Sequence, residues 1–117
     1  MVTASKWKAV RFYGPIRKVV HDWPEEVRKE LGAVLTLLQK GQSVGMPDLR
    51  PMPSVQSGVA EIRISDRSGT FRTFHVIHSE HGILVFHAFT KKTQKTPDQE
   101  IETGKKRLRE FLQELGE

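Results

Sequence analysis

The hydrophobic pattern of the chain is clearest between residues 59 and 90, where three stretches rich in β-branched and aromatic residues follow one another. These stretches read VAEIRIS, TFRTFHVIH and GILVFHAFT. They are separated by DRSG (66–69) and SEHG (79–82), which have the composition and length of hairpin turns. The pattern predicts a meander of three antiparallel β-strands.

Polar and apolar residues alternate in the first of these strands. The apolar positions are Ala60, Ile62 and Ile64, and the polar positions are Glu61, Arg63 and Ser65. This two-residue period predicts that one face of the strand is buried and that Arg63 faces outward. The other two strands carry apolar residues at both parities, which leaves their faces unassigned. A central strand that is covered on both sides would account for this pattern.

A helical period replaces the strand pattern after Pro24. The apolar residues that recur at helical spacing are Val27, Leu31, Val34, Leu35 and Leu38. Asp22 and Glu25 resemble a capping box around the first turn, where Pro24 is well placed. Gly41 is suited to end the helix. This segment therefore predicts a helix that begins at Pro24 and stops at Gly41.

The C-terminal segment carries a second helical pattern. Thr96 is placed to be the N-cap, with Pro97 at the first helical position and Gln99 in capping-box register. The apolar stripe consists of Ile101, Leu108, Phe111, Leu112 and Leu115. The basic run KKRLR (105–109) lies mostly on the opposite face. Gly104 is expected to weaken this helix.

The remaining segments complete a predicted α+β fold. Lys6–Tyr13 has the composition of a first strand, and Ile16–Asp22 is long enough for one or two helical turns. The proline-rich residues 42–58 predict a loop with a very short strand near Leu49. We therefore expect a small antiparallel sheet, made of the N-terminal strand plus the three-stranded meander, packed with two or three helices in a single domain of residues 1–117.

Composition excludes several classes of protein. The chain has no cysteine, which rules out disulfides and thiolate sites. No apolar run approaches the roughly 18–20 residues of a membrane-spanning helix, and the N-terminus lacks a signal-peptide pattern, so we expect a cytoplasmic protein without membrane contact. Paired metal-binding carboxylates, an HExxH motif and a glycine-rich phosphate loop are absent, and neither a metal nor a cofactor is expected. The formal net charge of +5 suggests a polyanionic partner.

The cations of the predicted sheet are grouped. Arg63 and Arg72 lie on adjacent strands, and Lys91, Lys92 and Lys95 follow the end of the third strand. Such a group suits a polyanion such as a nucleic-acid backbone, because the planar fork of arginine can donate two hydrogen bonds to one phosphate. Lys91 and Lys92 are also candidates for a base or an acid in proton transfer. Solvated ion pairs of the arginines and purely solubilising lysines are the alternative interpretation.

The order of the elements and three motifs resemble a known family. VAEIRI, GTFR and FHAFTKKTQKTP follow a strand, a helical hairpin and a proline-rich loop, as in the RelE/ParE toxin superfamily and, more narrowly, its phage-derived HigB-like branch. The resemblance is strongest from Ala60 to Pro97. It implies a toxin of a type II toxin–antitoxin module that cleaves mRNA on the ribosome and so inhibits translation. It also implies a helix-turn-helix, HigA-like antitoxin as the partner in a hetero-oligomer.

The resemblance assigns roles to individual residues. Arg72 matches the family's phosphate-contacting arginine, Arg63 matches a functional basic position, and Lys92 matches a catalytic cation. RelE-type enzymes have another lysine two residues before Arg63, where this chain has Glu61, and the tail helix has no tyrosine. His87 is a candidate for proton transfer instead.

The predicted site therefore has two overlapping sets of residues. The catalytic candidates are Arg63, Arg72, Lys91, Lys92 and His87, and the RNA-contacting candidates are Arg63, Arg72, Lys91, Lys92 and Lys95. Two other functions stay open. One is a ParE-like toxin without nuclease activity that inhibits another target such as DNA gyrase, and the other is a basic RNA- or antitoxin-binding module with no activity.

Overall fold

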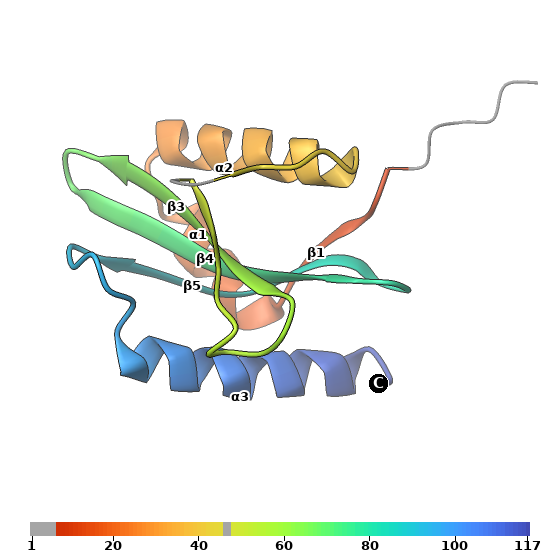
Figure 1. The fold of residues 1–117 in the computed structure, drawn as a ribbon. Helices are drawn as coiled ribbons and strands as arrows, with labels where there is room; N and C mark the ends of the chain where they lie inside the picture. The colour runs from red at the N-terminus through yellow and green to blue at the C-terminus, as the bar shows by residue number, and fades with distance from the viewer. Residues whose placement is uncertain (1–6, 46–47) are drawn as a thin grey trace, which may run out of the picture.

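The computed structural model describes residues 7–45 and 48–117, which form an α+β fold with a mixed sheet between helices (Figure 1). The strands are β1 (Val10–Phe12), β2 (Leu49–Pro51), β3 (Val59–Asp66), β4 (Gly69–His78) and β5 (Gly82–Lys91). The helical elements are a 3-10 turn (Gly14–Ile16), α1 (Arg17–His21), α2 (Glu25–Gln39) and α3 (Asp98–Glu114). No helix in the described ranges combines the length and the apolar character needed to cross a membrane.

The predicted α+β class and the meander of β3, β4 and β5 are confirmed, but the sheet is larger and is mixed. Its strand order is β1-β5-β4-β3-β2. The short strand expected near Leu49 is β2, which pairs with β3 at one edge. At the other edge β1 pairs with β5 in parallel, with Val10 opposite Ile83, so the prediction of a wholly antiparallel sheet was wrong. β1 covers only part of the predicted strand Lys6–Tyr13, and Lys6 lies outside the described residues.

Helices cover both faces of the sheet (Figure 1). One face, here called the α2 face, packs against the buried residues of α2, and the other, the α3 face, packs against Leu108 and Phe111 of α3. β4 and β5 lie inside this arrangement, and every residue from Ile83 to Phe89 is buried. Coverage from both sides explains why these strands carry apolar residues at both parities.

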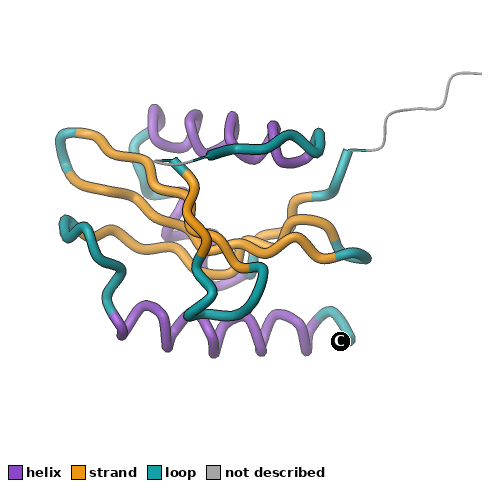
Figure 2. Tube along the Cα trace, viewed as in Figure 1, coloured by secondary structure: helices purple, strands orange, loops and turns teal. Residues whose placement is uncertain are grey.

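The close approach of α3 to the sheet depends on Gly104. A Cβ atom at this position would lie 2.7 Å from the Cδ2 atom of Phe74, and such a contact is too short to exist without movement. The proline-rich loop between β2 and β3 passes beside α3 (Figure 2), and its Val55 also approaches Gly104. Gly104 therefore has a packing role that its low helix propensity does not suggest.

Both predicted N-caps were wrong, whereas the predicted helix end at Gly41 is confirmed. Pro24 and Pro97 occupy the N-cap positions of α2 and α3, without a side-chain capping bond. Asp22 instead ends α1 and pairs with Lys18 at 3.2 Å. Thr96 is buried and its hydroxyl donates to a carboxylate on β3. Both side chains find partners outside the helix they were expected to cap.

Candidate nucleic-acid interface

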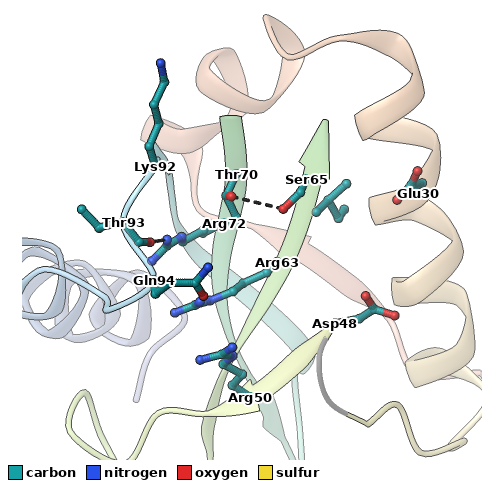
Figure 3. Close-up of a pocket in the computed structure, with 11 residues that line it drawn as sticks. Glu30, Asp48, Arg50, Arg63, Ser65, Thr70, Arg72, Lys92, Thr93 and Gln94 are labelled. Atoms are coloured by element: carbon teal, nitrogen blue, oxygen red, sulfur yellow. Dashed lines mark hydrogen bonds between the residues drawn. The ribbon is translucent and has the colours of Figure 1, made fainter. Parts of the chain in front are cut away.

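A cavity of about 390 Å³ lies near the β3–β4 turn (Figure 3). Neighbouring strands each contribute one arginine to its lining: Arg50 on β2, Arg63 on β3 and Arg72 on β4. The segment after β5, which includes Gln94, forms a further wall, and Glu30 of α2 is among the carboxylates that line the cavity. The site is thus built from α2, three neighbouring strands and the segment after β5.

Strand register places the three arginines together. Arg63 and Arg72 are directly opposite each other in the antiparallel pair of β3 and β4. Arg50 is opposite Glu61, which lies on the same face of β3 as Arg63 because side chains two residues apart on a strand point the same way. Glu61 pairs with Arg63 and offsets one of these three positive charges, and the remaining excess of positive charge favours a phosphate-bearing ligand.

Arg72 is the least satisfied of these cations. Its side chain is only 1% exposed, and its Nη2 atom donates to the backbone carbonyl of Thr93. Its Nε and Nη1 atoms are buried without any partner among the described residues. Burial is the main cause that lowers the pKa of Arg72, and the nearby charge of Arg63 adds to it. A buried N–H without an acceptor is costly, so these two donors are suited to receive anionic oxygens.

Arg63 is held in a buried polar ring. Its Nε atom donates to Oε1 of Glu61 at 2.5 Å, and its Nη2 atom donates to the hydroxyl of Thr96 at 3.3 Å. The same hydroxyl donates to Oε2 of Glu61 at 2.9 Å. Glu61 has no exposed surface, so the expectation that polar residues of this strand face solvent was wrong at this position. Arg63 does pair with Glu61, but beneath α3 and not as a solvated surface pair.

The three predicted lysines are exposed and spread apart. Lys92 lines the cavity, and its side chain points away from the guanidinium groups of Arg63 and Arg72 (Figure 3). The Nζ atom of Lys91 lies 3.6 Å from Oε2 of Glu100, at the start of α3. Lys95 lines a second cavity of about 300 Å³, which shares Arg50, Arg63 and Gln94 with the first. A polyanion following both cavities would pass all three arginines.

His87 lies beneath α3 and is not among the residues that line the cavity. It is 3% exposed, and its Nε2 atom is 2.8 Å from Oε1 of Glu100. Its Nδ1 atom is 3.1 Å from Nη1 of Arg107, which can only donate, so Nδ1 accepts and Nε2 carries the ring proton. Burial is the main cause that lowers the pKa of His87, and the hydrogen bond that His87 donates to Glu100 acts in the opposite direction. These two contacts connect His87 of β5 with Glu100 and Arg107 of α3.

One group of potential metal ligands occurs among the described residues, and its members do not line the cavity. His78, His81 and Glu117 bring their ligand atoms within 4.8 Å of one another. The backbone N–H groups of Glu80 and His81 donate to Nδ1 of His78, so its Nε2 atom carries the ring proton and faces Glu117. Hydrogen bonding accounts for this cluster without a metal.

Arg50 and Thr96 are site residues that sequence reasoning missed. Arg50 sits between prolines in a segment predicted mainly as a loop, and only its pairing with β3 brings it beside Arg63. Thr96 was assigned to helix capping because of its position before Pro97. A direct signal for Arg50 was the predicted short strand near Leu49, since an edge strand carrying an arginine extends a basic sheet.

Comparisons with known proteins agree with this architecture. Residues 18–109 match the family described as phage derived protein Gp49-like (DUF891), a range that contains Arg50, Arg63 and Arg72. A structure of the Escherichia coli toxin RelE, an arginine-to-alanine double mutant in the free state, superposes with a TM-score of 0.52 at 16% sequence identity. The alignment covers 89% of this chain and 97% of that one. No sequence among curated proteins matches this chain.

The structural likeness and the family match support different conclusions. At 16% identity, the likeness to RelE shows a shared fold. The family match spans most of the chain and includes α2, the strands β2 to β5 and the greater part of α3. The chain belongs to the phage-derived Gp49-like family, a RelE-like family of toxins.

Proposed function

We propose that this toxin is a HigB-like, metal-independent endoribonuclease that cleaves mRNA on the ribosome and thereby inhibits translation. The observation that carries the proposal is Arg72, a buried cation with two unpartnered N–H donors beside Arg63 and Arg50. Charge-assisted bonds from arginine to phosphate are strong and often bidentate. A phosphodiester in the cavity would satisfy the donors that the free protein leaves without acceptors.

The proposed reaction is an internal transfer at one phosphodiester. The ribose 2′-oxygen loses its proton to a base and attacks the adjacent phosphorus, while the bond from phosphorus to the 5′-oxygen breaks. The leaving 5′-oxygen takes a proton from an acid, and the products are a 2′,3′-cyclic phosphate and a 5′-hydroxyl. Arg63 and Arg72 stabilise the negative charge that develops on the non-bridging oxygens.

Side chains that line the cavity can supply the proton transfers. We assign the acid role to Lys92, because an ammonium group can donate a proton to the leaving oxygen once its exposed side chain turns toward the arginines. The carboxylates of Glu30 and Asp48, which also line the cavity, are the candidate bases. Lys91 is engaged by Glu100, and we give it the task of attracting RNA. His87 is assigned a structural role, because its two ring nitrogens are occupied beneath α3.

Substrate binding requires a local movement of the 92–96 segment. Arg72 is 1% exposed and its Nη2 atom is held by the carbonyl of Thr93, so RNA reaches its guanidinium only when this segment shifts. Phosphate oxygens then replace the Thr93 carbonyl as acceptors. The exchange favours RNA because an ionised acceptor forms a stronger hydrogen bond than a peptide carbonyl.

The proposed partners follow from the family and from charge. A toxin of this kind is kept inactive by an antitoxin, and we propose a helix-turn-helix, HigA-like protein that forms a hetero-oligomer with it. The net charge of +5 favours approach to the polyanionic ribosome and mRNA. Action on ribosome-bound mRNA places the protein in the cytoplasm.

The test uses purified protein, ribosomes and a defined mRNA. We expect new RNA 5′ ends within the reading frame only when ribosomes are present, and we expect their loss with Arg72→Gln. The variant Arg109→Gln, which removes an exposed arginine of α3, should cleave like the wild type. Intact mRNA together with inhibited DNA supercoiling by gyrase would overturn the proposal in favour of a ParE-like target.

A further inference from the structure

Glu61 occupies the position at which the sequence departs from RelE-type enzymes, and its surroundings differ from those of a surface residue. It is fully buried, and its two carboxylate oxygens have different partners. Oε1 accepts from Nε of Arg63 at 2.5 Å, and Oε2 accepts from the hydroxyl of Thr96 at 2.9 Å. A carboxylate is retained in a buried place only when charge and hydrogen bonds compensate its lost hydration.

Thr96 closes the ring between these two residues. Its hydroxyl has a single proton, which it donates to Glu61, and its oxygen accepts from Nη2 of Arg63 at 3.3 Å. Thr96 is 5% exposed. The ring therefore fixes one side of the Arg63 guanidinium. The Nη1 atom of Arg63 has no partner among the described residues, and the residue lines the cavity.

The same ring holds one end of the segment that covers Arg72. Thr96 ends the 92–96 segment, and the ion pair of Lys91 with Glu100 holds the other end. Between these two anchors, the carbonyl of Thr93 accepts from Arg72. The ends of the segment are thus attached to β3 and α3, and its middle carries the carbonyl that accepts from Arg72.

We infer that Glu61 and Thr96 are positioning residues of the arginine site. They orient the guanidinium group of Arg63 toward the scissile phosphate and hold one end of the 92–96 segment in place. Glu61 therefore has a role of its own at the position where RelE-type enzymes have a lysine. The inference rests on the proposed ribonuclease function. A residue that orients a transition-state donor affects the rate of the chemical step more than the affinity for substrate.

The variant Glu61→Gln separates positioning from simple structural support. It removes a negative charge next to three arginines, so affinity for single-stranded RNA should be unchanged or higher, as measured by fluorescence anisotropy. The cleavage rate kcat should nevertheless fall by about tenfold or more, because Arg63 loses its fixed orientation. A merely structural role predicts that binding and cleavage fall together with the folded fraction.

The variants Thr96→Val and Thr96→Ser test the second residue. Valine has the shape of threonine without the hydroxyl, so kcat should fall by about tenfold while KM stays within about twofold. Serine keeps the hydroxyl and should restore the rate. Thr36→Val is the matched control, because the Thr36 hydroxyl binds the Gly32 carbonyl on the exposed side of α2. Its kcat should equal that of the wild type.

The orientation of the Arg63 side chain can also be measured without catalysis. The Nε–H group of Arg63 should give an NMR signal that exchanges slowly with water in the wild type, and this signal should move or vanish in Glu61→Gln and Thr96→Val but not in Thr36→Val. If the wild type cleaves no RNA while this signal behaves as expected, the ribonuclease proposal fails but the ring is real. Wild-type kcat in Glu61→Gln, or an unchanged signal in both variants, would overturn the positioning inference.

Discussion

The two faces of the sheet are both covered by helices, yet they are built differently. The α2 face is closed mainly by apolar contacts, such as the edge-to-face contact of Trp23 with Phe71 and the buried residues of α2. The α3 face carries charged residues under α3, among them Glu61, Arg63 and Arg72. Both faces bury apolar side chains, such as Leu108 and Phe111 on the α3 face, but only the α3 face also holds this group of charged residues where a ligand can reach them.

Loss of packing on the α2 face should have the largest effect on stability. Leu31 is 3% exposed, and Leu31→Ala should lower the free energy of unfolding by about 2–5 kcal/mol, measured by urea denaturation. Leu37 lies on the same helix but is 38% exposed, so Leu37→Ala should cost less than about 0.5 kcal/mol. Cleavage per folded molecule should be unchanged in both variants. A selective loss of cleavage in Leu31→Ala would show that the two faces are not separate in function.

Lowering the pH should destabilise the protein through His75, a buried histidine on the α2 face. Burial lowers the pKa of His75 to about 4, so this residue is neutral in the folded protein, while its unfolded-state pKa is near 6.5. Its contribution to stability is complete above pH 6.5 and is lost as the pH falls toward 4. The loss should reach up to about 3 kcal/mol.

The variant His75→Gln checks this assignment. It cannot titrate, so its free energy of unfolding should depend less steeply on pH between 6.5 and 4 than that of the wild type. Urea denaturation at several pH values measures the slope. Equal slopes for the two proteins would mean that His75 is not the source of the acid sensitivity.

Two helical glycines give the sharpest contrast between the faces. In α2, nothing lies within 4 Å of a Cβ atom placed at Gly32, so Gly32→Ala should stabilise the protein by up to about 1 kcal/mol. In α3, the same change at Gly104 forces a contact of 2.7 Å with Phe74. Gly104→Ala should therefore destabilise by about 1–3 kcal/mol. Thermal unfolding measures both, and a stabilised Gly104→Ala would contradict the close packing of α3.

The hydrophobic pattern predicted most of the elements but little of their pairing. Turn residues and alternation located the meander, and Gly41 marked the end of α2, because these are local effects of backbone geometry. The parallel pairing of β1 with β5 joins segments about seventy residues apart and has no local signal. Thr96 and Asp22 satisfied a local capping rule, but a tertiary partner, Glu61, binds the side chain of Thr96, and Lys18 of the preceding helix binds that of Asp22.

The candidate site was predictable only in part, for a similar reason. Arg63 and Arg72 were expected on adjacent strands, and their direct pairing confirms that placement. Arg50 joins them through β2, and the ring around Glu61 depends on Thr96, in the segment between β5 and α3, reaching the polar positions of β3. Sequence alternation assigns such positions to solvent whenever the covering element cannot be foreseen.

The central claim is that the arginine cavity cleaves RNA, and paired arginine variants test it most directly. The cleavage rate of ribosome-bound mRNA and the free energy of unfolding should be measured for Arg72→Gln and Arg109→Gln side by side. Arg72→Gln should lower the cleavage rate by about 10²–10³-fold, because one donor to the developing charge is lost. Its stability should change by less than about 1 kcal/mol, since most of its N–H donors have no partner to lose. Equal cleavage by both variants would contradict the account.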